Sequence, residues 1–145
     1  MSEIIPDSDT ISRLLFEPFM RPEEQDIIWK NVFQFSSKHG ALESVVWRRY
    51  APTIESVHGL GCKKQTSDRV ALKQSTYFGA ISACVADIKT IKSANGISFT
   101  VEHAPGEGIW HAHIGFSAGS NKNDRNSMKL LLKAKFSPVE CHSCS

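Results

Sequence analysis

The chain has 145 residues, and its 41% hydrophobic and 22% charged content is that of an ordinary folded domain rather than a disordered or fibrous protein. Seventeen basic against fifteen acidic side chains leave a formal charge of +2, which is too small for the general electrostatic attraction that drives nucleic-acid binding. One folded domain is therefore expected, and a nucleic-acid partner is not favoured.

The first nine residues mix acidic side chains, serine and proline without periodicity, so we expect a flexible arm over residues 1–9. Acidic residues stand where a secretion signal needs cations, and no window reaches the roughly 18 apolar residues of a membrane span. These features predict a cytoplasmic protein without a membrane partner. Because the cytosol is reducing, disulfides between the four cysteines are not expected.

The segment from Pro22 to Lys38 has most of the signals of a helix. Proline occupies a first helical position, two glutamates fill the first turn, and apolar residues recur on one face before Gly40. Residues 44–50 have the β-branched and aromatic content of a strand, which Pro52 ends.

After Pro52 we predict a short helix as far as about Leu60, because Gly59 and Gly61 are available to stop it. The stretch 61–75 is polar and weakly periodic, and we interpret it mainly as a loop.

Residues 76–82 predict a second strand. A further helix is predicted over residues 84–94, where apolar residues recur every three positions and Asn95-Gly96 supplies the left-handed residue that commonly ends a helix. Two segments of strict apolar and polar alternation follow, 97–103 and 110–116. The turn residues 104–108 join them, which predicts a β-hairpin.

The last predicted helix is capped by Asn123 and stopped by Ser137-Pro138, and residues 139–145 are expected to form a flexible tail. The order of elements predicts one α+β domain over residues 10–138. Its sheet is expected to be small and mostly antiparallel, with a β-hairpin in the C-terminal half and about four helices packed on it.

The hairpin carries the candidate catalytic groups. If the apolar faces of its two strands coincide, Glu102, His111 and His113 share the opposite face, with Glu102 opposite His111 or one pair further along. A carboxylate beside an imidazole fixes the histidine tautomer for acid–base work or metal binding. An arginine can hold an anion, and Arg49 is the candidate. His111, Glu102 and Arg49 are therefore the candidate catalytic residues, although a solvent-facing polar strand explains the same alternation.

His111 and His113 are also candidate metal ligands, because His-x-His on a strand directs two imidazoles the same way. The HUH nucleases hold their metal with such a pair. In those enzymes a catalytic tyrosine normally follows on a helix, whereas Tyr50 and Tyr77 both precede this motif. A divalent metal is thus expected only if the protein is a metal-assisted enzyme, and otherwise no cofactor is expected.

The C-terminal Cys141-His142-Ser143-Cys144 offers two thiolates and an imidazole, which is half of a four-ligand zinc site. Cys62 and Cys84 lack the usual ligand spacing and fit buried small hydrophobic positions. An unliganded tail is the favoured interpretation.

Several short motifs resemble those of small uncharacterised bacterial stand-alone proteins. They are an Ile-Ser-Arg start at residue 11, an aromatic-Arg strand at Trp47-Arg48, and His111-Ala112-His113-Ile114 before a leucine-rich final helix. The resemblance implies a bacterial cytoplasmic protein and supplies no reaction. Among polar positions it matches only Arg13, one of the strand arginines and His111.

Two functions fit these observations. The first is a small binding or regulatory module that acts with a protein partner, because only fragments of a catalytic set are present. The alternative is a metal-assisted hydrolase or nuclease that acts on a phosphate ester through the face of Glu102, His111 and His113.

Overall fold

The protein folds around one antiparallel sheet. A computed structural model describes residues 2–17, 22–23, 26–27, 32–35, 40–73 and 75–144. The strands are β1 (Thr10–Glu17), β2 (Pro22–Glu23), β3 (Asp26–Ile27), β4 (Glu43–Trp47), β5 (Thr76–Cys84), β6 (Phe99–His103), β7 (His111–Phe116) and β8 (Glu140–Cys141). The helices are α2 (Ile54–Val70), α3 (Val85–Lys89) and α4 (Lys122–Leu132), with 3-10 turns η2 (Pro105–Glu107) and η3 (Lys133–Lys135).

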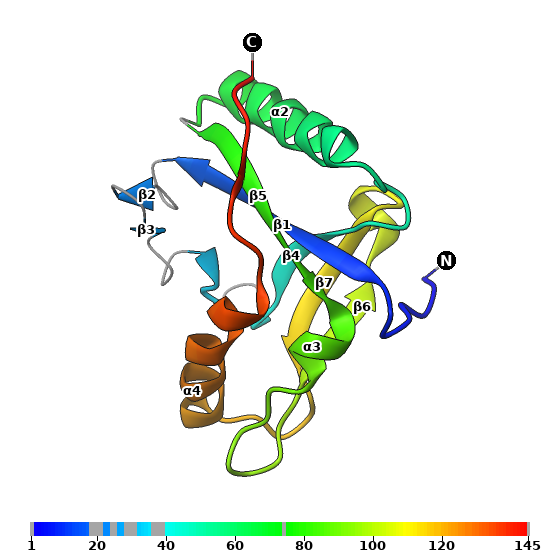
Figure 1. Cartoon of the computed structure of the whole chain (residues 1–145), viewed down its shortest axis with the longest axis vertical. Helices are drawn as coiled ribbons and strands as arrows, with labels where there is room; N and C mark the ends of the chain where they lie inside the picture. The colour runs from blue at the N-terminus through cyan, green and yellow to red at the C-terminus, as the bar shows by residue number, and fades with distance from the viewer. Residues whose placement is uncertain are drawn as a thin grey trace.

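Six strands form the main sheet in the order β6-β7-β4-β1-β5-β8, and β2 and β3 form a separate pair (Figure 1). The sheet is antiparallel throughout. The α+β class with a mostly antiparallel sheet is thus confirmed. The described ranges contain three complete α-helices, where about four were predicted.

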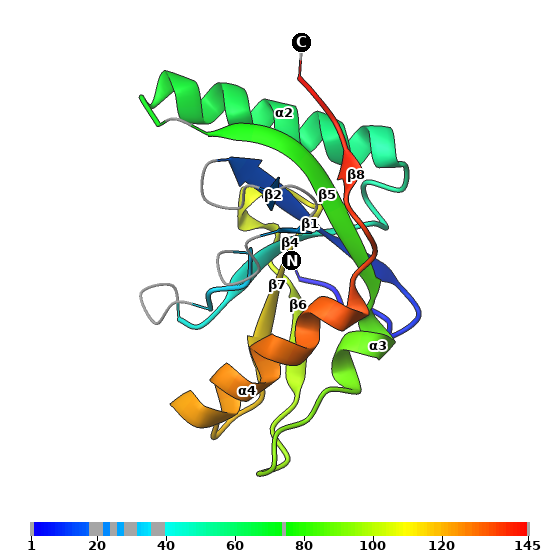
Figure 2. The same cartoon turned by 60° about the vertical axis from the view of Figure 1, so that its left-hand side comes forward.

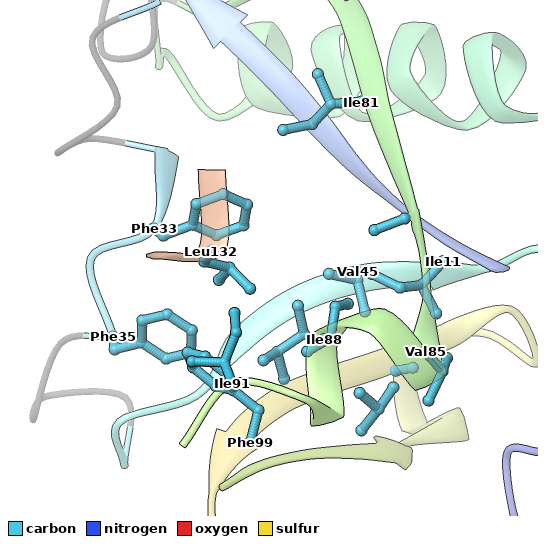
Figure 3. Close-up of a cluster of buried hydrophobic side chains, with 14 of the residues drawn as sticks. Ile11, Phe33, Phe35, Val45, Ile81, Val85, Ile88, Ile91, Phe99 and Leu132 are labelled. Atoms are coloured by element: carbon cyan, nitrogen blue, oxygen red, sulfur yellow. The ribbon is translucent and has the colours of Figure 1, made fainter. Parts of the chain in front are cut away.

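Helices cover both faces of the sheet. Figure 2 shows the sheet between α2 on one side and α3 with α4 on the other. On the α3 and α4 side lies the main core, drawn in Figure 3, where Ile11, Val45, Ile88 and Leu132 are fully or almost fully buried. A second cluster lies under α2 around the buried ring of Tyr77. Burial of this apolar area stabilises the fold by about 25 cal/mol per Å².

β1 is a central strand that the sequence did not reveal. Ile11 and Leu15 belong to the main core, whereas Leu14 belongs to the second cluster on the opposite face. A strand buried on both faces has no apolar and polar alternation, so its pattern does not indicate a strand.

The predicted helix from Pro22 to Lys38 is wrong over residues 22–23 and 26–27, whereas Val32 is helical. Pro22–Glu23 pairs with Asp26–Ile27 as a short antiparallel ladder, and residues 24–25, 28–31 and 36–38 of the predicted helix lie outside the described residues. Further along, one carboxylate oxygen of Glu43 accepts the backbone N–H groups of Gln34 and Phe35, both at 2.7 Å. A side chain that takes these N–H groups competes with helical carbonyls for them.

Two other helices differ in length from the predictions. α2 continues to Val70 through the stretch that was interpreted as a loop, and a capping box of Thr53 and Ser56 begins it. α3 ends at Lys89 instead of residue 94, because the Ser93 hydroxyl accepts the N–H groups of Asn95 and Ile97 and closes a turn. α4 is capped by Asn121 rather than Asn123.

Both terminal segments pack on the domain, in contrast with the flexible ends that were expected. Ile5 is buried, and a carboxylate oxygen of Asp9 accepts a hydrogen bond from the indole of Trp47 at 2.7 Å. At the other end, β8 pairs with β5.

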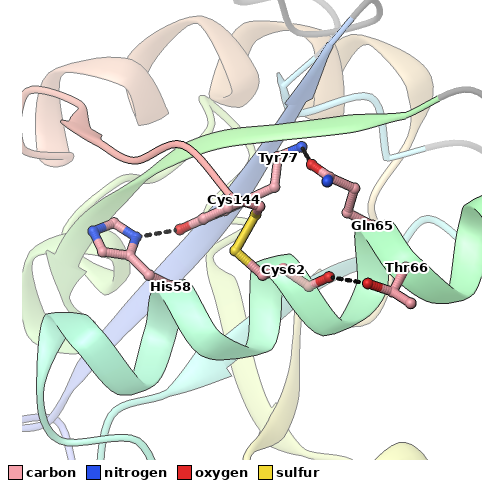
Figure 4. Close-up of a disulfide and its surroundings, with 6 residues drawn as sticks. All are labelled: His58, Cys62, Gln65, Thr66, Tyr77 and Cys144. Carbon is pink, nitrogen blue, oxygen red and sulfur yellow. Dashed lines mark hydrogen bonds between the residues drawn. A yellow bond between two sulfur atoms is a disulfide. The ribbon is translucent and has the colours of Figure 1, made fainter.

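A disulfide joins Cys144 to Cys62 of α2 (Figure 4). The expectation of no disulfide was therefore wrong for this pair. That expectation depended only on the reducing conditions of the cytosol. In the structure, the C-terminal tail packs on α2 and brings the two Cα atoms to 5.7 Å, within the range that a disulfide spans. In the described ranges, no helix combines the length and apolar character needed to cross a bilayer.

Candidate functional site

A pocket of about 560 Å³ opens on the α2 side of the sheet, over β1, β4 and β7. This volume falls in the range of small-molecule sites, roughly 300–1,000 Å³. Its apolar lining comes from Leu14, Phe16, Leu42, Val46 and Trp110. Its polar lining comes from Arg13, Glu43, Ser44, Lys64, Glu107, His111 and His113. Apolar walls with convergent polar groups are the usual composition of a ligand site.

The imidazole of His111 is held between a backbone carbonyl and a serine. Its Nδ1 lies 2.8 Å from the carbonyl oxygen of Ala104, which can only accept, so Nδ1 carries the proton. The lone pair on Nε2 then faces the hydroxyl of Ser44 at 3.1 Å. Because His111 is 3% exposed, this geometry is fixed by packing rather than by solvent. A hydroxyl that donates to an oriented imidazole has the geometry of a nucleophile with its base.

Strand pairing brings Ser44 and His111 together. In β4, Val46 lies opposite His111 and Ser44 lies opposite His113, so all four side chains share one face. The connection through η2 returns the chain over this face. It places a carboxylate oxygen of Glu107 3.5 Å from Nε2 of His111. Glu107 is 75% exposed, so its attraction for a protonated His111 is screened by water.

His113 lies beside this pair with its ring centroid 4.7 Å from that of His111 and nearly perpendicular to it. Burial lowers the pKa of His113, and the nearby His111 lowers it further, while Glu107 and Glu102 act in the opposite direction. His113 is therefore neutral near pH 7 and adds a polar but uncharged wall to the pocket.

The predicted catalytic residues do not all meet in one place. Glu102 lies opposite His113, one pair beyond His111, and borders a second hollow along the outer side of β6. Arg49 is exposed and stacks over the rings of Trp47 and Tyr50, 5.7 and 5.8 Å from their centroids. His111 and His113 line the pocket, whereas neither Glu102 nor Arg49 does.

Arg13 is the arginine at this site, and it has a structural role. Its guanidinium donates to the carbonyls of Ser44 at 2.9 Å and Val32 at 3.1 Å and pairs with Glu43 at 3.1 Å. Burial lowers the pKa of Arg13, and Glu43 partly offsets this effect. The group stays charged, because an arginine guanidinium is not deprotonated in proteins. Arg13 thus ties β1 to β4 where the two strands separate.

His111 and His113 do not form a three-ligand metal site with a neighbouring carboxylate in the described ranges. Within those ranges, a group of three donors that could hold a metal is formed by Cys62, His142 and Cys144, between α2 and the C-terminal segment. Both ring nitrogens of His111 already have partners. The pocket therefore supports chemistry by side chains more directly than chemistry by a bound metal.

Sequence reasoning missed Ser44, Glu107 and Lys64 as pocket residues. Ser44 is a single serine in a predicted strand. No local signal showed that this strand would pair with β7, because Ser44 and His111 are 67 residues apart in the sequence. Lys64 comes from the part of α2 that was interpreted as a loop and brings a positive charge to the pocket wall.

No protein-family model matches this chain, and comparisons with curated proteins and with solved structures gave no significant match.

Proposed function

We propose that the protein is a small hydrolase that cleaves a carboxylic ester in the pocket over β4 and β7. The observation that carries the proposal is the 3.1 Å contact between the Ser44 hydroxyl and Nε2 of His111, whose Nδ1 proton is held by Ala104. The proposal keeps only the hydrolase class of the alternative predicted from the sequence, which was a metal-assisted enzyme acting on a phosphate ester. It assigns the attack to Ser44 in place of a metal-bound water, because both nitrogens of His111 are engaged.

The proposed reaction follows the logic of serine hydrolases. Ser44 Oγ attacks the ester carbonyl while its proton passes to Nε2 of His111. The imidazolium gives this proton to the departing alcohol, which leaves an acyl group on Ser44. A water molecule, deprotonated by His111, then releases the acid and restores both side chains. Glu107 lies where its negative charge favours the transient imidazolium.

The pocket walls support a partly apolar substrate. Phe16, Leu42 and Trp110 provide an apolar surface for its acyl or alcohol group. Lys64, which pairs with Asp68 at 3.3 Å, adds a cationic group to the α2 wall of the pocket.

A fluorophosphonate probe tests this proposal without knowledge of the substrate. The probe forms a covalent bond with an activated serine, so we expect mass spectrometry to find it on the peptide that contains Ser44. Ser44→Ala should abolish labelling. His111→Gln should slow labelling by about 10²–10⁴-fold, which is the usual contribution of a general base. Ser67→Ala, which removes an exposed serine on α2, serves as the matched control and should label like the wild type.

Equal labelling of the wild type and Ser44→Ala would refute the proposed nucleophile. Ester hydrolysis should also persist in the presence of a chelator. A phosphodiesterase activity that needs a divalent metal and disappears in His113→Ala would favour the metal-assisted alternative instead.

A second proposal, a module that binds a protein partner, is supported by the outer edge of β6. Lys92 already pairs with Ser98 through an isolated antiparallel bridge at the start of this edge. Beyond it, Ala104 directs its backbone N–H toward β7, so the alternation of a strand turns the backbone groups of Val101 outward. Lys92 stands at one end of the hollow along this edge and Glu102 at the other. A second copy of the chain added antiparallel to β6 would place each lysine near a glutamate of its partner.

Charge reversal tests this pairing. Lys92→Glu or Glu102→Lys alone should weaken self-association roughly tenfold, because each creates two like-charged pairs at about 0.5–1 kcal/mol each. The double variant Lys92→Glu/Glu102→Lys should restore the wild-type constant in sedimentation equilibrium. A wild-type chain that stays monomeric at millimolar concentration would refute the β6 dimer.

A further inference from the structure

A cluster of sulfur and imidazole ligands lies between α2 and the C-terminal segment, away from the proposed hydrolase pocket. Cys62 projects from α2, and His142 and Cys144 follow β8. The sulfurs of the two cysteines and a ring nitrogen of His142 all lie within 4.8 Å of one another. In a tetrahedral zinc site with bonds of about 2.0–2.3 Å, ligand atoms are roughly 3.3–3.8 Å apart, so small side-chain rotations would bring these three donors to one ion.

His58 is the fourth candidate ligand, and because its ring nitrogens are outside the group of donor atoms within 4.8 Å of one another, its side chain has to rotate to reach the ion. His58 precedes Cys62 by four residues, so both side chains lie on the same face of α2. Its ring stacks on that of His142 with centroids 4.3 Å apart.

Tyr77 can orient this histidine. Its hydroxyl lies 2.7 Å from Nδ1 of His58, and Figure 4 shows the contact beside the disulfide. When Nδ1–H donates to the tyrosine oxygen, Nε2 keeps a free lone pair. A metal-binding histidine commonly has such a hydrogen bond on its other nitrogen.

We propose that His58, Cys62, His142 and Cys144 form a zinc site. The site and the Cys62–Cys144 disulfide cannot exist at the same time, because both use the same two sulfurs. A dithiol reductant transfers two electrons and two protons to the disulfide and becomes a disulfide itself, which leaves two cysteine thiols. Zn²⁺ then binds both sulfurs as thiolates, and two protons are released. Two thiolates with two imidazoles are a donor set that suits zinc. The C-terminal segment is thus held on α2 by a covalent bond in the oxidised chain and by the ion in the reduced chain.

Cobalt titration of the full chain tests this site, because tetrahedral Co²⁺ with thiolate ligands has visible and near-ultraviolet bands that Zn²⁺ removes on displacement. The chain is first reduced with dithiol, which is then removed without air. We expect the reduced wild type to bind one Co²⁺ with thiolate-to-metal bands and the oxidised wild type to show none. Cys144→Ser should abolish these bands, and Tyr77→Phe should weaken binding by about 10–100-fold, as expected for loss of an orienting hydrogen bond.

Cys141→Ser is the matched control, because Cys141 is an exposed cysteine of the same segment that is free of the disulfide. It should titrate like the wild type. Because the oxidised and reduced wild type have the same sequence, their comparison does not depend on whether any variant folds. Absence of thiolate bands in the reduced wild type, equal bands in the oxidised chain, or loss of binding in Cys141→Ser would each overturn the proposal.

Discussion

Replacing Arg13 with methionine is expected to lower the free energy of unfolding by about 3–5 kcal/mol, the usual cost of removing one partner of a buried ion pair. The side chains of Arg13 and Glu43 are only 13% and 12% exposed. The substitution leaves the Glu43 carboxylate without its cation and the carbonyls of Ser44 and Val32 without a donor. Urea denaturation followed by circular dichroism measures the loss.

Arg49→Met is the matched control, because it removes the same group from an exposed position. Its stacking over Trp47 and Tyr50 is worth about 0.5–1 kcal/mol, so the expected loss is small. Glu43→Met added to Arg13→Met should recover part of the stability, since it removes the unpaired carboxylate. Equal losses for Arg13→Met and Arg49→Met would contradict the structural role of Arg13.

The sequence did not predict which of these two arginines lies at the pocket. The sequence made Arg49 the candidate because the forked donors of a guanidinium can hold an anion. The sequence does not show that β1 and β4 pair only at Ile11 with Trp47 and at Ser12 with Val46 before they separate. Arg13 fills the space that this separation opens. A gap between strands that are distant in sequence leaves no local pattern.

The histidine face was predictable in part. The alternation in residues 110–116 placed Ala112 and Ile114 toward the main core and the two histidines on the other side, as in the structure. It also placed Trp110 on the core face, which is wrong, because Trp110 packs against the second cluster and lines the pocket with the histidines. It did not predict that His111 would be buried, because the cover comes from the loop that contains Glu107 and from Trp110. Side-chain direction follows from the period of two, whereas burial depends on what packs above the strand.

Local helix signals were misleading where a distant side chain competed with the backbone. Proline and two glutamates predicted a helix after residue 22, yet the described residues there form a β ladder, and Glu43 binds the N–H groups of Gln34 and Phe35. Tertiary contacts of this kind override propensity, which amounts to a few tenths of a kcal/mol per residue.

Local signals were also misleading for α2. Gly59 and Gly61 predicted the end of the helix near Leu60, but the helix continues to Val70. The buried positions Val57, Gly61 and Gln65 recur every four residues, as a helix face requires, but only one of them is a large apolar residue. The apolar period is therefore absent from the sequence. Gly61 allows the helix backbone to approach the ring of Tyr77, and this close packing is the reason for a glycine within the helix.

Replacing Gly59 or Gly61 of α2 with alanine should therefore change the free energy of unfolding in opposite directions. At Gly59 a new Cβ meets nothing within 4 Å, so Gly59→Ala should raise the free energy of unfolding by about 0.5–1 kcal/mol through helix propensity. At Gly61 the new Cβ would lie 2.6 Å from Cγ of Tyr77 and closer still to two other ring atoms. Gly61→Ala should therefore lower the free energy of unfolding by about 1–3 kcal/mol, the usual cost of overpacking a core.

The ring of Tyr77 cannot move aside easily, which is why a loss is expected at Gly61 in spite of the gain in propensity. Tyr77 is fully buried, its hydroxyl lies 2.7 Å from His58, and its N–H donates to Gln65 at 2.8 Å. Urea denaturation of both variants measures the two changes under identical conditions, with the disulfide intact in each. If Gly61→Ala stabilised the protein as much as Gly59→Ala does, α2 would not pack against Tyr77 at this distance, and the position of the helix on the sheet would have to be revised.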